Sequence, residues 1–85
     1  MPDNKVTLTI VVNGQPTTVD ANRNAPLLTV IPHALSQTGN VGQPPENWEL
    51  RDQAGNLLDV QAKVSSFGFE DGTRLYLNLK AGIGG

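Results

Sequence analysis

An alternating segment that runs directly into an asparagine-glycine pair most constrains the fold of this chain. Over residues 6–12 the apolar residues Val6, Leu8, Ile10 and Val12 alternate with Thr7, Thr9 and Val11, the period-two pattern of a β-strand with one buried face. Asn13-Gly14 follows, and this pair favours a type I′ turn because both of its positions need a positive φ. β-branched residues return over residues 17–19. The chain is therefore predicted to open with a β-hairpin.

The following segment predicts a helix that contains a proline. Asn24 is a candidate N-cap and Pro26 falls near the first helical position. Apolar residues then recur at helical spacing as far as Leu35, and Gly39 stands where a left-handed terminating residue is needed. Pro32 removes one helical hydrogen bond, so we expect a kink or a short irregular turn there.

The second half of the chain predicts strands joined by loops. Residues 48–52 and 74–80 alternate clearly, residues 57–59 suit a short strand, and residues 41–47 form a crossing loop. Trp48 and Phe67 are expected in the core. This order predicts an α+β fold, with a mixed four- to five-stranded sheet and one helix packed across one face. The last strand is expected to run parallel to the first.

Composition excludes several classes of function. The 85 residues, 38% of them hydrophobic, suffice for one small domain. No cysteine is present, which excludes disulfides and a thiol nucleophile. The net charge is −2 and the basic residues are scattered, which argues against binding to nucleic acid. No apolar run is long enough to span a membrane. His33 is the single histidine. The adjacent acidic residues Glu70 and Asp71 are interpreted as part of a turn. We expect no enzyme activity, metal or cofactor.

The end of the sequence offers different chemistry. We expect a folded domain over residues 1–79 and a flexible tail that consists of Lys80, Ala81, Gly82, Ile83, Gly84 and Gly85. Glycines without a Cβ fit a channel too narrow for other residues. Six extended residues reach about 20 Å at roughly 3.3–3.6 Å each. The tail therefore predicts a protein modifier or group carrier whose reactive atom belongs to the Gly85 carboxylate.

The order and spacing of these signals resemble the ubiquitin-like β-grasp family over nearly the whole chain. The resemblance rests on residues 6–12, Asn13-Gly14, residues 26–35, Gly39, Pro44-Pro45, residues 48–52, 54–56 and 71–75, and Gly84-Gly85. Residues 44–48 and 68–75 look most like bacterial ubiquitin-like modifiers with a C-terminal diglycine. The resemblance implies a cytoplasmic modifier that an activating enzyme adenylates with ATP and a conjugating enzyme passes to a target lysine. It also implies a deconjugating peptidase.

Partners of such a protein would need a docking face. Arg51, Arg74, Tyr76 and Asn78 share the outward phase of the predicted strands, so they form the candidate face, with both arginines available to a partner carboxylate. Two other functions remain open. Sulfur carriers of the β-grasp type also end in diglycine and receive sulfide as a thiocarboxylate. A non-conjugated interaction module would make the terminal glycines incidental.

Overall fold

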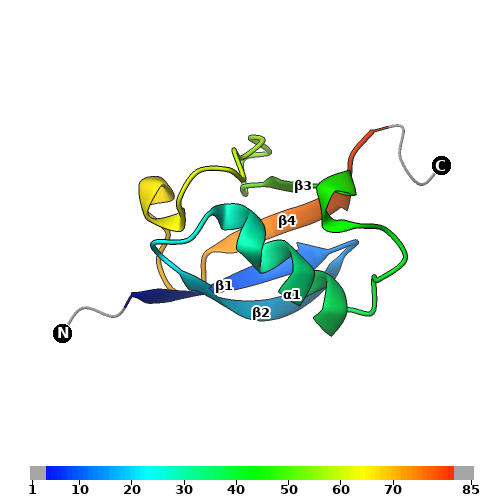
Figure 1. The fold of residues 1–85 in the computed structure, drawn as a ribbon, viewed down its shortest axis with the longest axis horizontal. Helices are drawn as coiled ribbons and strands as arrows, with labels where there is room; N and C mark the ends of the chain where they lie inside the picture. The colour runs from blue at the N-terminus through cyan, green and yellow to red at the C-terminus, as the bar shows by residue number, and fades with distance from the viewer. Residues whose placement is uncertain (1–3, 82–85) are drawn as a thin grey trace.

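The computed structural model describes residues 4–81 and has an α+β fold, with one helix packed across one face of a mixed four-stranded sheet (Figure 1). The strands are β1 (Lys5–Val12), β2 (Gln15–Asn22), β3 (Trp48–Arg51) and β4 (Arg74–Leu79), in the spatial order β2-β1-β4-β3. The α-helix is α1 (Val30–Gln37), and short 3₁₀ helices are η1 (Leu27–Thr29), η2 (Pro45–Asn47) and η3 (Val64–Phe67).

The predicted opening hairpin is confirmed. Asn13 has a φ of 50° and Gly14 a φ of 86°, the pair of positive values that a type I′ turn requires. β2 is longer than predicted, since it pairs with β1 along its whole length, from Val12 opposite Gln15 to Lys5 opposite Asn22. Cross-strand pairing thus extends the strand beyond the predicted residues 17–19, as far as Asn22.

The centre of the sheet is the parallel pair of β1 and β4, as predicted. Thr9 lies opposite Arg74 and Val12 opposite Leu77. Parallel neighbours need a long crossover, and here α1 and β3 lie within it. β3 then adds antiparallel to the outer side of β4.

The helix begins later than predicted. Pro26 precedes the 3₁₀ turn η1, and α1 starts at Val30, so Pro32 lies in the first α-helical turn, where its missing N–H is tolerated. The irregular turn expected at Pro32 therefore precedes it. Asn24 is not the N-cap, because η1 and α1 have no side-chain cap. None of the helices in residues 4–81 has the length and apolar character needed to cross a membrane.

The end of the helix follows the prediction. Gly39 has a φ of 75°, and its N–H donates to the Ser36 carbonyl at 3.2 Å. The Asn40 N–H donates to the Leu35 carbonyl at 2.8 Å. These two bonds form a Schellman motif, which satisfies carbonyls that the helix leaves unpaired. Glycine is favoured because the left-handed region is open to it without steric cost.

The predicted short strand at residues 57–59 is wrong. This segment makes one isolated bridge, between Leu57 and Arg51, and one further bond from the Leu58 N–H to the Leu50 carbonyl at 2.9 Å. After that bond it leaves β3, because the Val60 carbonyl accepts the Leu28 N–H beside the helix. The described residues therefore contain four strands, and the outer edge of β3 is covered only in part.

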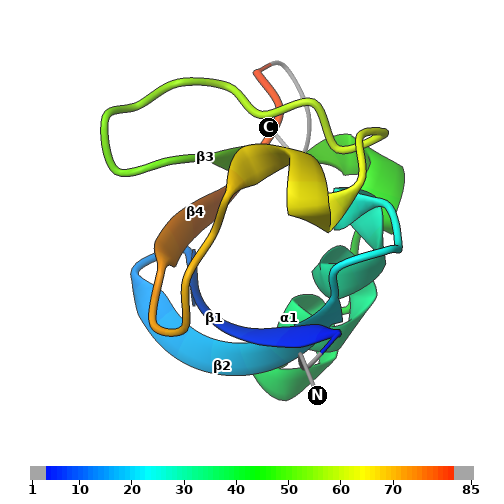
Figure 2. The same cartoon turned by 90° about the vertical axis from the view of Figure 1, so that its left-hand side faces the viewer.

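The core lies between the concave side of the sheet and α1, around which the sheet curves (Figure 2). Its buried members are Val6, Leu8, Ile10, Val12, Val19, Ala21, Leu27, Val30, Ile31, Ala34, Leu35, Trp48, Leu50, Val64, Leu75 and Leu77. Trp48 is buried as predicted. Phe67 is only half-buried, since it packs at the margin of the core and stacks on Phe69 with ring centroids 5.0 Å apart. The prediction of Phe67 as a core anchor is thus only partly correct.

Truncation of central core side chains should be costly. Ile10→Ala and Leu77→Ala should each lower the free energy of unfolding by about 2–5 kcal/mol, since both side chains are fully buried. Thr9→Ala and Asn78→Ala, matched controls from the opposite face of the same strands, should change it by less than about 1 kcal/mol. Urea denaturation measures all four values, and equal losses in both pairs would contradict the assigned strand phase.

Candidate functional site

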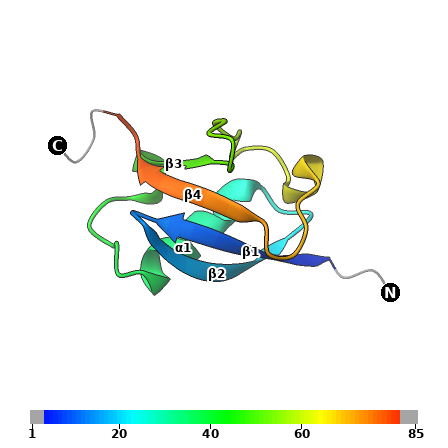
Figure 3. The ribbon, with the colours of Figure 1, turned by 180° about the vertical axis from the view of Figure 1, so that it is seen from behind.

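The sheet has one face that α1 does not cover, which we call the open sheet face (Figure 3). Its side chains include Thr9, Val11, Pro16, Glu49, Arg51, Arg74, Tyr76 and Asn78. All four residues predicted as a docking face therefore lie on one surface. They come from the two adjacent strands β3 and β4.

Tyr76 occupies the middle of a row that crosses the open sheet face. It lies opposite Val11 of β1 on one side and Arg51 of β3 on the other, and Val11 lies opposite Pro16 of β2. Val11 is only 8% exposed although it points away from the core. Its neighbours in the row must therefore cover it, and Pro16, Val11 and Tyr76 form a short apolar strip.

Pro16 was missed by sequence reasoning, although a signal was present. A two-residue turn at Asn13-Gly14 sets the hairpin register, and that register places Pro16 opposite Val11. Proline lacks an N–H, and it is tolerated here because β2 is an edge strand.

The two arginines on this face differ in whether their side chains form hydrogen bonds within the described residues. The Arg51 Nε donates to the Glu49 carboxylate at 2.7 Å, and its Nη1 donates to the Gly55 carbonyl at 2.9 Å. Arg51 is thus held within the chain through two of its donors, while 43% of its side chain stays exposed, and its binding to a partner carboxylate stays a prediction. Arg74 is exposed and has no polar partner among residues 4–81. Arg74 is therefore a cation of this face that a partner carboxylate can bind without displacing a bond described within residues 4–81.

A carboxylate-centred turn holds Arg51 in place. The Asp52 Oδ1 accepts the N–H groups of Asn56 and Ala54, each at 2.9 Å. The hydrogen bond from the Asn56 backbone, with smaller contributions from neighbouring donors, lowers the pKa of Asp52 below its usual value. Because the same turn presents the Gly55 carbonyl, ionised Asp52 helps to fix the position of Arg51.

The remaining predicted site residues belong to the tail. Gly82, Ile83, Gly84 and Gly85 lie outside the described residues. Lys80 and Ala81 are exposed, and the Lys80 N–H donates to the Asn47 carbonyl at 2.9 Å. The last described backbone bond toward the tail thus joins the end of β4 to η2.

The lone histidine and the acidic pair do not form a reactive cluster in the described part of the chain. His33 is exposed on α1. Glu70 and Asp71 lie in a turn, where the Asp71 Oδ1 accepts the Thr7 N–H at 2.9 Å and Gly72 has a φ of 88°. The interpretation of Glu70-Asp71 as turn residues agrees with this geometry.

Four strands in the order β2-β1-β4-β3 that curve around one helix define the ubiquitin-like β-grasp fold. Among solved structures, the chain is similar to ubiquitin from Caldiarchaeum subterraneum, with a TM-score of 0.72, 23% identity, and coverage of 95% of this chain and 99% of that one. A protein designed on the basis of ubiquitin gives a TM-score of 0.78 at 20% identity, with 99% of each chain covered. The ubiquitin-like domain of Plasmodium falciparum Dsk2 gives 0.71 at 18% identity, with 89% and 99% covered.

The chain belongs to the family described as Protein of Unknown function (DUF2604), which matches residues 1–85. It is 53% identical over 81 residues to the Uncharacterized protein y4jI of Sinorhizobium fredii. That match includes 95% of this chain and spans 62% of the length of the relative.

The low pKa of Asp52 predicts a pH-dependent contribution to stability. A depressed folded-state pKa means that the contribution is complete above the unfolded value, near 3.9, and is lost as the pH falls through the folded value. Asp52→Asn should therefore be less stable than the native chain at neutral pH, and the difference should shrink in acid. Thermal unfolding from pH 7 to pH 2 measures this, and a constant difference would contradict it.

Proposed function

We propose that this protein is a ubiquitin-like modifier whose Gly85 carboxylate is activated by a partner enzyme and transferred to an amine of a target protein. The observation that carries the proposal is the Gly84-Gly85 pair, which follows the end of β4 at Leu79 by only a few residues. Support comes from the ubiquitin-like fold and from the Lys80 bond to Asn47, which directs β4 out of the domain beside η2.

The chemistry needs no side chain of this protein. A carboxylate is a poor electrophile, so a Gly85 oxygen would first attack the α-phosphorus of ATP and displace pyrophosphate. A cysteine thiolate of the activating enzyme would then attack the acyl carbon and release AMP. After exchange onto a conjugating enzyme, a target lysine amine would attack the thioester, lose a proton and release the thiolate. The enzymes would supply all catalytic groups and ATP, and a peptidase would reverse the final bond.

The domain would contribute recognition and orientation. A partner bound on the open sheet face near the end of β4 is also near the start of the tail, and orientation of reacting groups can supply several kcal/mol of a reaction barrier. The apolar strip of Pro16, Val11 and Tyr76 offers a small nonpolar contact, and Arg74 offers one unpaired charge. This pattern suits a partner with a compact apolar patch and a single carboxylate.

Conjugation should require the terminal glycines, and its loss in variants of these residues should not result from a lower folding stability. Incubation with ATP and an extract of cells that express the protein should give covalent adducts, which intact-mass and peptide mass spectrometry identify. Deletion of Gly85, or Gly84→Trp, should abolish these adducts, whereas Ala81→Ser, a matched change nearer to β4, should preserve them. Normal conjugation by a chain without Gly85 would overturn the proposal.

The same experiment separates the alternative functions. A sulfur carrier would yield a thiocarboxylate in place of an isopeptide, and the two products differ in mass. A non-conjugated interaction module would yield no adduct of either kind, with or without ATP.

Tyr76 should contribute to enzyme binding, since it is half-buried at the centre of the open sheet face and tyrosine is enriched at the centres of interfaces. Tyr76→Ala should weaken binding to the activating enzyme recovered from the extract by at least about 1 kcal/mol. Ser36→Ala, an exposed change on α1 on the other side of the sheet, should have little effect. Calorimetric titration of folded variants measures both, and an unchanged affinity for Tyr76→Ala would exclude this face as the docking surface.

A further inference from the structure

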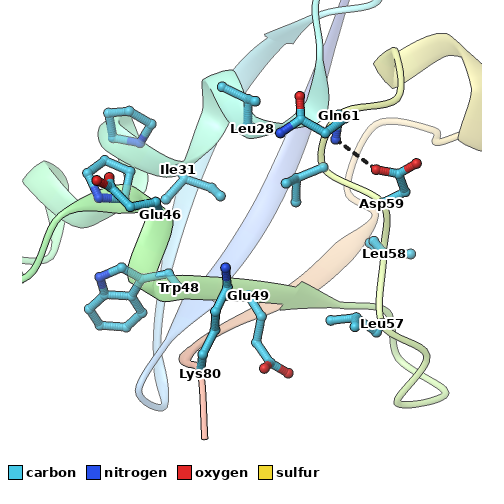
Figure 4. A pocket seen from close by; sticks show the side chains of 13 residues that line it. Leu28, Ile31, Glu46, Trp48, Glu49, Leu57, Leu58, Asp59, Gln61 and Lys80 are labelled. Atoms are coloured by element: carbon cyan, nitrogen blue, oxygen red, sulfur yellow. Dashed lines mark hydrogen bonds between the residues drawn. The ribbon is translucent and has the colours of Figure 1, made fainter. Parts of the chain in front are cut away.

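A pocket lies on the other side of β3 from the open sheet face, and nothing in the proposed conjugation uses it. Its volume is about 510 Å³, and β3, η2, the start of the helix and residues 57–61 enclose it (Figure 4). The apolar lining comes from separate segments and includes Leu28, Ile31, Trp48, Leu57, Leu58 and Val60. Leu57 is 61% exposed, so the pocket leaves part of its apolar lining in contact with solvent.

Backbone groups on the adjacent edge of β3 lack partners. The bond from the Lys80 N–H to the Asn47 carbonyl shows which residues of β3 bond to β4. Because hydrogen-bonded and non-hydrogen-bonded pairs alternate along an antiparallel ladder, the backbone groups of Glu49 and Arg51 bond to β4. The backbone N–H and C=O groups of Trp48 and Leu50 therefore point away from β4. The Leu50 carbonyl is satisfied by Leu58, but the Trp48 carbonyl and the Leu50 N–H have no hydrogen bond within residues 4–81. One residue of an added parallel strand could bond to both, with its side chain on the same face as Glu49 and its two neighbours directed toward the pocket.

A second unpaired donor lies in the pocket wall. The Trp48 side chain is only 3% exposed, and its Nε1 has no acceptor among the described residues. A buried indole N–H normally finds a partner, because leaving a buried donor unpaired costs about 1–3 kcal/mol. This donor is itself buried, so a bound segment would reach it only if Trp48 repacks, and the indole N–H therefore reports any such rearrangement.

The charges around the pocket indicate the sign of the charge that its ligand should carry. Glu46 and Asp59 lie on opposite sides of it and form no ion pair within the described residues (Figure 4). Glu49 is neutralised by Arg51 at 2.7 Å, and Lys80 supplies one positive charge. The unpaired rim charges thus sum to −1, from two carboxylates and one ammonium, and the whole chain carries −2. The two carboxylates favour a ligand with a basic group on each side of an apolar centre.

We propose that this pocket binds an extended segment of a partner protein, in which a branched apolar side chain fills the pocket between two flanking lysines or arginines. The main chain of the segment bonds to the Trp48 carbonyl and the Leu50 N–H, and its basic side chains reach Glu46 and Asp59. This binding is noncovalent and does not depend on the proposed conjugation. It therefore gives the protein a second recognition surface.

Trp48 reports binding directly, because it is the only tryptophan of the chain. The probe is a terminally blocked peptide with the sequence lysine-valine-leucine-valine-lysine, titrated into the intact protein. We expect a saturable change in tryptophan fluorescence and, by nuclear magnetic resonance, shifts of the Leu50 amide and the Trp48 indole N–H. The same peptide with glutamates in place of lysines should not bind. Absence of binding by the lysine peptide at millimolar concentration would overturn the proposal.

Two matched comparisons test the chemistry of recognition. The double variant Glu46→Gln with Asp59→Asn should weaken binding by about two- to thirtyfold, the range for two exposed ion pairs. Glu70→Gln, an exposed acid outside the pocket, should leave it unchanged. N-methylation of both valines should weaken binding by about two- to tenfold through loss of one hydrogen bond, because side chains alternate along a strand and the residue bonded to β3 is a neighbour of the leucine that fills the pocket. Equal binding by all variants, or shifts confined to Tyr76 and its neighbours, would place the peptide elsewhere and contradict the proposal.

Discussion

The parallel pairing of β1 with β4 is the constraint on which the rest of this structure depends. It joins the first and last strands of the described residues at the centre of the sheet, and the crossover between them carries α1 and β3. Because both strands point the same way, the end of β4 lies far from the start of β1. The tail therefore begins at the end of the domain where η2 and the start of β3 lie.

The same pairing builds the open sheet face. Val11 and Tyr76 become neighbours only because β1 and β4 are adjacent, and the hairpin then adds Pro16 to the strip. Charges on this face are arranged unequally, since Glu49 and the Asp52 turn hold Arg51 while Arg74 has no partner in the described part of the chain. The surface thus presents a small apolar strip, with Arg74 as a cation that has no partner there.

β3 has a different surface on each of its sides. Its outward side chains belong to the open sheet face, whereas Trp48 and the unpaired edge groups border the pocket. Sequence reasoning found the outward set, because alternation along residues 48–52 assigns the phase of each side chain. It missed the pocket, because Leu28, Leu57 and Val60 are distant in sequence and carry no common pattern. It also missed the Arg51–Glu49 pair, since spacing alone does not choose the partner of a charged side chain.

The sequence by itself determined the local elements of this protein. Alternation set the phase of β1, β3 and β4, Asn13-Gly14 set the hairpin, and Gly39 ended the helix, because each of these depends on nearby backbone preferences. Only the tertiary structure decided features that depend on long-range contacts. Cross-strand pairing extended β2 to Asn22, and the bond between Leu28 and Val60 drew the expected fifth strand away from β3. That departure opened the pocket, which no local preference encodes.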